Sequence, residues 1–342
     1  MKIMQIVAGE STGGTAKHVL ELSSELSRSS EVIVVCDQSF KGKLEDTIQH
    51  IHFDFSKSTL PATFQLYQII CQIKPDIIHT HGNKASKFAG IIRRFVSIPC
   101  IGTIHWHLKK KKEKSFFSRL DLVIGVSDGV LEGVKCKRKV VVHNGIPYIP
   151  PQQTKQQIRS KLNLTDSHPV VVAIGRMTKS KGFDILVSAW ASINAHLILI
   201  GDGPAKPELE AMAKELNIAD HVHFLGNIDN ATQFFPAIDL VVVSSLHEGF
   251  SYVIAEALIH KKPIISTDVT LARQILPSNW VVKASNIKLM REKILSALAT
   301  PEQHQEDLQE AYGFAENHFT LDKMTESILT CYRQALSDSN SK

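Results

Sequence analysis

The sequence predicts an α/β protein made of two doubly wound domains, on three observations. Its length of 342 residues suits two domains better than one. Short apolar runs alternate with stretches of helical periodicity, as in a parallel sheet covered by helices on both faces. The sequence YIPPQQT at 148–154 interrupts this alternation, which then resumes. We therefore expect an N-terminal domain at 1–149, a linker at 150–157, a second domain at 158–310, and C-terminal helices at 311–342 that pack back toward the first domain.

The predicted strands are short apolar runs. In the first predicted domain they are residues 3–8, 31–36, 48–53, 76–80, 100–104, 122–126 and 139–143. In the second they are residues 170–174, 196–200, 222–225, 240–243, 264–266 and 280–282. Helices are predicted over 15–27, 62–73 and 84–95, and through the tail at 287–336. Parallel sheets of this kind bind ligands at the carboxyl ends of their strands, so the loops after the strands are the candidate sites.

The composition is that of an ordinary globular protein, with 43% hydrophobic and 21% charged residues. No apolar run approaches the ~18 residues of a membrane span, and the N-terminal segment predicts a first strand rather than a signal peptide. We therefore expect a cytoplasmic protein. The five cysteines are scattered and never spaced as Cys-x-x-Cys, which predicts neither a disulfide framework nor a zinc site.

The segment at 244–268, SSLHEGFSYVIAEALIHKKPIISTD, predicts the main binding site. It predicts a strand, a loop, a helix over 252–259 capped by Ser251, and a second strand. The free N–H groups and positive end of that helix attract phosphate. Glu256, about a turn inside the helix, can accept hydrogen bonds from ribose hydroxyls, and Glu248 on the loop can reach the group beyond the phosphate. A nucleotide-linked sugar fits such a site; the alternative is two solvated glutamates without a ligand.

Glu248 and Glu256, with Gly249 and Phe250 after the first of them, resemble the Glu-x7-Glu donor motif of retaining glycosyltransferases of the GT-B type, most closely glycosyltransferase family 4. The resemblance covers nearly the whole chain. It implies two facing Rossmann-like domains with a cleft between them, the first binding the acceptor and the second the nucleotide-sugar donor. It also implies that Glu256 holds the ribose and Glu248 the sugar hydroxyls, with the Gly249 and Phe250 amides helping.

The loop after the predicted strand at 170–174 carries Gly175, Arg176 and Lys181. A glycine lets the backbone turn close to a ligand, and an Arg and a Lys in one loop can close on a diphosphate from two sides. A solvated loop is the alternative. The sequence GRMTKSKG resembles the phosphate clamp of family 4, which assigns Arg176 and Lys181 to the leaving diphosphate.

Two further glycine turns are donor-site candidates. Gly201 and Gly203 follow the next strand and resemble the family's second glycine turn, although Gly-x-Gly-Pro is also a common strand-to-helix turn. Gly13 and Gly14 precede the first helix and resemble the loop that covers the donor diphosphate in family 4. The dinucleotide-binding and Walker glycine patterns are absent here, so neither of those sites is expected.

Two histidine pairs lie at the ends of predicted strands, His79 with His81 and His105 with His107. His105 matches the family's cleft histidine better than His107 does, so we expect it to face the reacting carbon or position the acceptor. His-x-His without a nearby cysteine or carboxylate in ligand spacing is seldom a metal site. The Asp-x-Asp handle for magnesium is absent. We therefore expect no metal and no cofactor, with the nucleotide-sugar as co-substrate.

Residues 1–150 are basic, with 21 Lys and Arg against 13 Asp and Glu. The densest run is Lys109, Lys110, Lys111 and Lys112, followed by two phenylalanines. Such a run is usually a solvated face, but it can also rest on anionic lipid. Nucleic acid is not expected, because no recognition motif accompanies the charge. We expect a glycan or a lipid-linked acceptor, with peripheral contact at the cytoplasmic face of the membrane.

Together these residues predict a retaining, metal-independent glycosyltransferase that uses a UDP- or GDP-sugar in cell-surface polysaccharide or lipopolysaccharide assembly. The chain departs from the family at Lys261, where a glycine is usual, and at 269–274, where Gly-Gly and a Glu are usual. These departures put the wall near the donor in doubt. An inactive binding or partner subunit with the same fold is the alternative, and a nucleotide-sugar epimerase is a third possibility.

Overall fold

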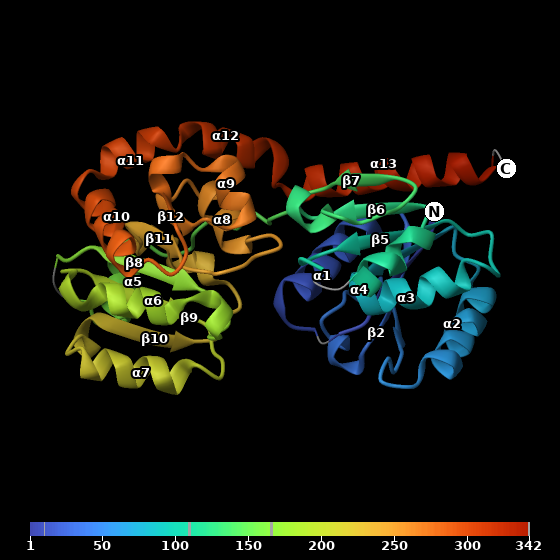
Figure 1. The fold of residues 1–342 in the computed structure, drawn as a ribbon, viewed down its shortest axis with the longest axis horizontal. Helices are drawn as coiled ribbons and strands as arrows, with labels where there is room; N and C mark the ends of the chain where they lie inside the picture. Colours follow the sequence, from blue (N-terminus) through green and yellow to red (C-terminus); the bar gives the residue numbers. More distant parts are fainter. Residues whose placement is uncertain (10, 109–110, 165–166, 341–342) are drawn as a thin grey trace. The chain divides into compact units, whose positions relative to one another are not determined.

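A computed structural model describes residues 1–9, 11–108, 111–164 and 167–340 (Figure 1). The chain forms two compact units. Unit 1 contains Met1–Gly145 and the segment from His318 onward, and unit 2 is Ile146–Asn317. The breaks between the units therefore lie at Gly145 and His318, whereas the sequence placed them at 149 and 311. Part of the expected linker is already helical, because α5 spans Lys155–Lys161.

Unit 1 is built on a parallel sheet with strand order β3-β2-β1-β4-β5-β6-β7. Its strands are β1 (Lys2–Val7), β2 (Glu31–Cys36), β3 (Gln49–His52), β4 (Ile77–His81), β5 (Cys100–Ile104), β6 (Leu122–Gly125) and β7 (Lys139–Val141). Its helices are α1 (Gly13–Ser27), α2 (Thr59–Ile73), α3 (Gly82–Ile92), α4 (Lys111–Phe116) and α13 (Leu321–Asn340). The strand order reverses direction between β1 and β4, which is where doubly wound sheets bind ligands.

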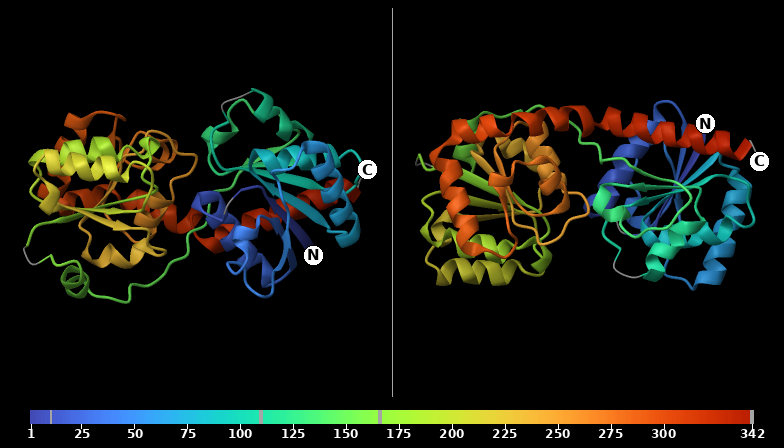
Figure 2. Two further views of the ribbon diagram at one scale, coloured as in Figure 1. Left: turned by 90° about the horizontal axis from the view of Figure 1, so that it is seen from below. Right: turned by 45° about the horizontal axis from the view of Figure 1, so that its top comes forward.

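Helix α13 belongs to the core of unit 1, along which it runs in Figure 2. Its Met324, Ile328 and Tyr332 are buried with α1 and with alternate residues of the central strands, such as Ile101. Residues of opposite parity face the other side of the sheet. A Cβ at Gly102 would lie 3.2 Å from Ser86 Oγ of α3. The two faces of the sheet are therefore covered by different helices, as the alternation of apolar runs predicted.

Unit 2 repeats the architecture, with strand order β10-β9-β8-β11-β12-β13. Its strands are β8 (Val170–Ile174), β9 (His196–Ile200), β10 (Val222–Gly226), β11 (Leu240–Val243), β12 (Ile264–Thr267) and β13 (Val281–Val282). Its remaining helices are α6 (Phe183–Ala189), α7 (Lys206–Glu215), α8 (Tyr252–Ile259), α9 (Thr270–Ile275), α10 (Ile287–Ala299), α11 (Pro301–Asp307) and α12 (Gln309–His318). The order reverses between β8 and β11, so the loops after these two strands flank the switch point.

Each predicted strand is present, and the α/β class with two Rossmann-like domains is confirmed. The helix predicted over 252–259 is α8, with the expected bounds. Ser251 is its N-cap in position, but its side chain makes no cap hydrogen bond. The predicted helical tail is divided into α10, α11, α12 and α13. Among the helices that the structure describes, none is long and apolar enough to cross a membrane.

Candidate functional site

The glycine turns after β8 and β9 are interlocked. Gly175 N donates to Ile200 O at 2.9 Å and Met177 N donates to Asp202 O at 2.8 Å. A Cβ at Gly201 would lie 2.0 Å from Gly175 O, and a Cβ at Gly203 would lie 2.4 Å from Met177 O. Backbone atoms of one turn occupy the space that a side chain on the other turn would need. The predicted donor-site glycines of the two turns therefore form one structural unit.

The β8 loop is also fixed to the loop after β11. Ser244 Oγ donates to Lys181 O at 2.8 Å, and Leu246 N donates to Ser180 O at 2.8 Å. Gly182 has φ +62°, and a Cβ there would lie 2.2 Å from Ser244 O. Both the left-handed conformation and the close backbone approach require glycine at this position.

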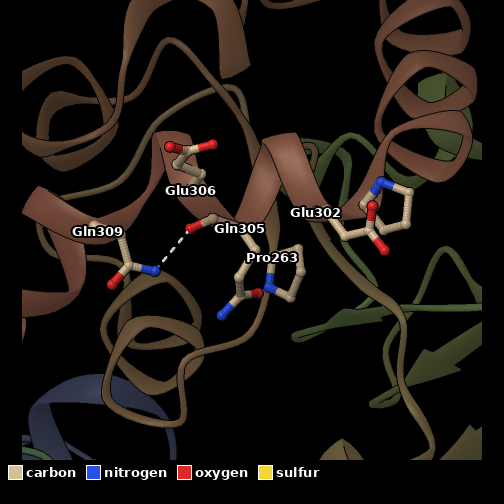
Figure 3. Close-up of a pocket in the computed structure, with 6 residues that line it drawn as sticks. Pro263, Glu302, Gln305, Glu306 and Gln309 are labelled. Carbon is tan, nitrogen blue, oxygen red and sulfur yellow. Dashed lines mark hydrogen bonds between the residues drawn. The ribbon is translucent and has the colours of Figure 1, made fainter.

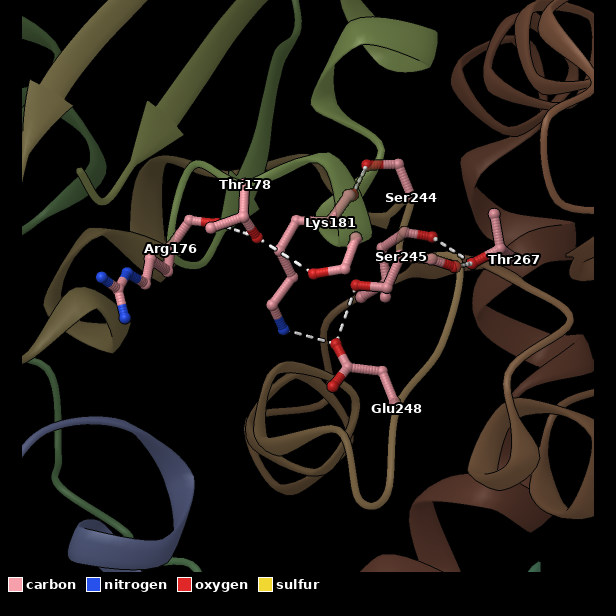
Figure 4. Close-up of polar contacts among 9 residues, drawn as sticks. Arg176, Thr178, Lys181, Ser244, Ser245, Glu248 and Thr267 are labelled. Atoms are coloured by element: carbon pink, nitrogen blue, oxygen red, sulfur yellow. Dashed lines mark hydrogen bonds and ion pairs between the residues drawn. The ribbon is translucent and has the colours of Figure 1, made fainter. Parts of the chain in front are cut away.

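Lys181 and Glu248 meet between these two loops (Figure 4). Lys181 Nζ lies 2.5 Å from Glu248 Oε1, and the two side chains are 26% and 13% exposed. Ser245 Oγ donates to the same carboxylate oxygen at 2.7 Å. Thr267 Oγ1 donates to Ser245 O at 2.5 Å, which connects β12 to this loop. A cation and an anion are thus held rigidly at the switch point of unit 2.

The other predicted donor-site residues of unit 2 lie near Lys181 or Glu248 in the sequence, and they differ in exposure. Arg176 is exposed, and its guanidinium points away from the Lys181 and Glu248 side chains (Figure 4). Glu256 is 8% exposed on α8, and Phe250 is 7% exposed beside the helix start. The sequence assigned Lys181 to the diphosphate and Glu248 to the sugar, and it did not predict that they form an ion pair.

In unit 1, the predicted glycine loop lies at the start of α1. The helix begins at Gly13, which has φ +80° and open space where a Cβ would be, so it starts before the predicted Thr15. Gly13 and Gly14 are exposed at the switch point between β1 and β4. Nothing lies within 4 Å of a Cβ added at Gly13, so no close packing contact requires a glycine there. This exposed position agrees with a ligand-contacting loop.

His105 lies in a buried cluster of histidines at the carboxyl ends of β4 and β5. One ring nitrogen from each of His18, His81 and His105 lies within 4.8 Å of one from each of the others. The three side chains are 1%, 2% and 9% exposed. Burial lowers the pKa of His18 to about 4 and lowers the pKa of His81 and of His105 well below the usual value. These imidazoles are therefore neutral at physiological pH.

His79 lies beside this cluster but is fully hydrogen-bonded. Its Nδ1 lies 2.7 Å from Tyr332 Oη, and its Nε2 lies 2.7 Å from Thr103 Oγ1. Burial lowers the pKa of His79 to about 3. The sequence singled out His79, His81 and His105 but missed His18, although His18 lies in the segment after the Gly-Gly loop. His18 lies within an amphipathic helix pattern, which gives no signal of its partners.

The lysine run contributes little that can be described. Lys109 and Lys110 lie outside the described residues, and so do the side chains of Lys111 and Lys112, whose backbone begins α4.

A surface hollow of about 530 Å³ lies in unit 2, against Pro263 and the helices α11 and α12 (Figure 3). None of the predicted site residues lines this hollow.

Two family models match the chain, one over each half. The model described as Glycosyltransferase Family 4 matches residues 12–148, and the model described as Glycosyl transferases group 1 matches residues 154–313. These matches include every candidate donor-site residue and His105.

Among curated proteins, the chain is similar to two lipopolysaccharide core biosynthesis glycosyltransferases of Rhizobium meliloti. It is 26% identical to LpsD over 300 residues, covering 85% of this chain and 83% of LpsD. It is 29% identical to LpsE over 198 residues, covering 57% of this chain and 56% of LpsE. The match thus spans about half the length of LpsE and most of LpsD.

Solved structures share the fold over nearly the full length. Anabaena HepE, determined in complex with UDP, has a TM-score of 0.87 at 20% identity, covering 98% of this chain and 100% of HepE. WaaG, a glycosyltransferase involved in lipopolysaccharide biosynthesis, has a TM-score of 0.74 at 15% identity, covering 95% and 98%. With the two family models and the paired Rossmann-like sheets, these likenesses show that the chain belongs to glycosyltransferase family 4 and has the GT-B fold.

Proposed function

We propose that the chain is a retaining glycosyltransferase that moves a sugar from a UDP- or GDP-sugar to a glycan or lipid-linked acceptor in cell-surface polysaccharide or lipopolysaccharide assembly. The observation that carries the proposal is the Lys181–Glu248 pair at the switch point of unit 2, with Glu256 on the helix that follows. LpsD and LpsE are lipopolysaccharide core biosynthesis glycosyltransferases, which supports the biosynthetic setting, and the UDP bound by HepE supports the donor class.

In this proposal the diphosphate is bound by cations of the protein. Lys181 and Arg176 would neutralise the charge that develops on the leaving diphosphate, which is the largest contribution that most active sites make to catalysis. Gly13 and Gly14 would bind donor phosphate through their backbone amides at the start of α1. Because two side-chain cations meet this charge, a metal ion on the diphosphate is not required, and the reaction would be metal-independent.

The remaining groups would position the sugar. Glu256 would accept hydrogen bonds from the ribose hydroxyls, and Glu248 from hydroxyls of the transferred sugar, with the Gly249 and Phe250 amides helping. His105 would contact the sugar or the acceptor as a neutral imidazole. The acceptor hydroxyl would attack on the face that the diphosphate leaves, passing its proton to the departing phosphate oxygen. Such a reaction keeps the anomeric configuration without a protein nucleophile.

The test is nucleotide release from a panel of UDP- and GDP-sugars in EDTA, with the native chain, Glu256→Ala and Lys181→Ala. We expect slow hydrolysis of one donor, lost in both variants and kept in Lys179→Ala. Lys179 is the matched control, because it is an exposed lysine in the same short helical turn. Loss of release in EDTA that Mg²⁺ or Mn²⁺ restores would contradict metal independence.

An inactive binding or partner subunit is the second candidate, because the chain departs from the family near the donor. Lys261 adopts φ +52°, a conformation that favours the usual glycine, and its Nζ pairs with Glu316 at 2.9 Å. This departure keeps the backbone course after α8, which supports an active enzyme. No nucleotide release, together with no donor-dependent rise in melting temperature, would favour the partner subunit instead.

A further inference from the structure

Trp106 differs from the other two tryptophans of the chain in its exposure. It is 44% exposed, whereas Trp190 and Trp280 of unit 2 are 0% and 4% exposed. Single exposed apolar side chains are common on proteins, so exposure alone assigns no role to Trp106. Its place in the fold and its contacts decide what this ring can do.

Trp106 lies at the edge of the first sheet where ligands are expected. It follows the carboxyl end of β5, one residue after His105. Strand β4 pairs with β5, and α3 begins at Gly82 directly after β4. The loop after β5 is thus close to the switch point between β1 and β4, where doubly wound sheets bind ligands.

The Trp106 ring is held against the first residue of α3. A Cβ at Gly82 would lie 2.7 Å from Trp106 Cη2, and 3.4 and 3.5 Å from Cζ2 and Cζ3. Gly82 also has φ +79°, so both its backbone conformation and its contact with the ring favour glycine. Since Cη2 is the nearest atom, Gly82 meets the indole at its outer corner, and much of the ring stays exposed.

The surroundings of Trp106 suit a sugar. The centroids of the Trp106 and His105 rings lie 6.4 Å apart. Burial lowers the pKa of His105 well below its usual value, so the imidazole beside the indole is neutral. Small-molecule sites combine aromatic side chains with a few polar groups that fix the orientation of the ligand. A sugar ring has apolar C–H faces and polar hydroxyls, which match such a combination.

We propose that Trp106 stacks on a pyranose ring of the acceptor, beside His105. An aromatic face carries partial negative charge and the C–H groups of a pyranose carry partial positive charge, so the two attract each other while they exclude water. The acceptor then presents a sugar ring, which narrows the acceptor class of the proposed function. The inference rests on that proposed function for the transfer itself.

The test is a fluorescence titration of the full chain with the methyl pyranosides of glucose, galactose, mannose and N-acetylglucosamine, with and without UDP. We expect at least one of these sugars to change the tryptophan emission of the native chain, because a sugar ring covers Trp106. Glycerol, which has no ring, should leave the emission unchanged. Trp106→Phe should lose the change, since Trp190 and Trp280 are buried in unit 2.

Two outcomes of the titration would overturn the proposal. The first is an emission of the native chain that none of the four sugars changes. The second is an emission change that persists in Trp106→Phe, because it would then arise from the tryptophans of unit 2.

Saturation-transfer difference NMR with the same sugars compares variants that differ in their aromatic ring. Trp106→Phe keeps a ring and should bind within about threefold of the native chain, whereas Trp106→Ala should bind more than about tenfold more weakly. Rescue by phenylalanine separates stacking from a loss of folding. Equal binding by the native chain and Trp106→Ala would overturn the proposal.

Phe95→Ala is the matched control. Phe95 is a 69% exposed aromatic residue of unit 1 that follows the carboxyl end of α3, whereas Trp106 contacts the first residue of that helix. Phe95→Ala should bind the sugars as the native chain does. Equal losses in Phe95→Ala and Trp106→Ala would assign the binding to exposed aromatic surface in general and overturn the proposal.

Failure of this inference differs from failure of the proposed function. The titrations contain no donor sugar, so they do not depend on turnover. Nucleotide release by a chain whose Trp106 responds to no pyranoside would contradict this inference alone. Sugar binding through Trp106 in a chain that releases no nucleotide would contradict the transfer alone and support a glycan-binding site.

Discussion

Lys181 Nζ and Glu248 Oε1 form an ion pair at 2.5 Å although they lie on different loops of unit 2. Each is partly shielded from water, so the pair is less screened than a surface salt bridge. The lysine is therefore held at one place by the glutamate and by the Ser244 contact to its backbone oxygen. A diphosphate would meet a cation that is already positioned, which reduces the entropy lost on binding.

Lys181 and Glu248 should contribute to the binding of different parts of the donor. Lys181→Ala should weaken the binding of the free nucleotide and of the nucleotide-sugar to the same extent. Glu248→Ala should weaken the nucleotide-sugar about 10–100-fold more than the nucleotide, because hydrogen bonds to a charged group contribute about 1.5–3 kcal/mol. Isothermal titration calorimetry with the donor found in the panel measures both. Equal losses for the two ligands in Glu248→Ala would contradict a sugar-binding role.

Gly182→Ala should destabilise unit 2 by about 3 kcal/mol, because strain and a backbone clash act together. Gly226→Ala is the matched control. Its φ is +71°, but nothing lies within 4 Å of the added Cβ, so only the left-handed strain of about 1–2 kcal/mol applies. Urea unfolding followed by tryptophan fluorescence compares the two variants. Equal destabilisation would show that the loop can move away from Ser244.

Unit 2 should become less stable as the pH is lowered, because of His304. This side chain is 1% exposed, stacks on Trp280 at 3.8 Å, and lies 3.0 Å from Ile264 O through Nε2. Burial lowers its pKa to about 4, so between about pH 6.5 and 4 the unfolded chain binds a proton that the folded chain does not. This histidine's contribution is complete above pH 6.5 and is lost as the pH falls.

His304→Gln removes this titration and can still donate to Ile264 O. From pH 6.5 to 5, the native chain should lose about 2 kcal/mol of unfolding free energy more than the variant does. Urea titrations at both pH values, observed through tryptophan fluorescence, give the difference. Parallel losses in the two chains would mean that other groups govern the acid sensitivity.

Tyr332→Phe should destabilise unit 1 by about 1–3 kcal/mol, because it leaves His79 Nδ1 buried without its 2.7 Å partner. Tyr148→Phe is the control, since Tyr148 is 61% exposed and should change stability by less than about 0.5 kcal/mol. Urea unfolding of the full chain compares the variants, with Trp106 as the tryptophan of unit 1. An unchanged midpoint in Tyr332→Phe would mean that another group satisfies His79.

If the lysine run contacts anionic lipid, changing Lys109, Lys110, Lys111 and Lys112 to glutamine should weaken binding to anionic vesicles more than about tenfold. The control changes four exposed lysines of unit 2, which are Lys179, Lys214, Lys283 and Lys288. Co-sedimentation at two salt concentrations measures binding, which should fall as salt rises. Equal binding of the native chain and of the first variant would assign the run to a solvated face.

The sequence predicted the elements well because local patterns determine them. Apolar runs located the strands, and Ser251 as an N-cap before an apolar run located α8 at its observed bounds. The loop glycines were also predictable, since Gly182, Gly201 and Gly203 need conformations or spaces that other residues lack. Such requirements are local, and a single sequence contains them.

The side-chain pairings were not predictable, because they depend on which strands are neighbours. Lys181 and Glu248 were assigned to separate tasks, and only the adjacency of β8 and β11 brings them together. His18 was missed because a histidine inside an amphipathic helix pattern carries no sign of its partners. Its place beside His81 and His105 depends on the order β1-β4-β5, which brings α1 next to two strand ends.

The discontinuous makeup of unit 1 has a consequence for how the protein is made. During synthesis, β1 to β7 emerge first, and all of Ile146–Asn317 follows before Leu321–Asn340 leaves the ribosome. Until then, one apolar face of the first sheet lacks Met324, Ile328 and Tyr332. Since domains fold as units while the chain is synthesised, unit 2 can complete its fold before unit 1, although unit 1 begins the chain. The nascent protein is thus most exposed to chaperones and to aggregation in the half that is made first.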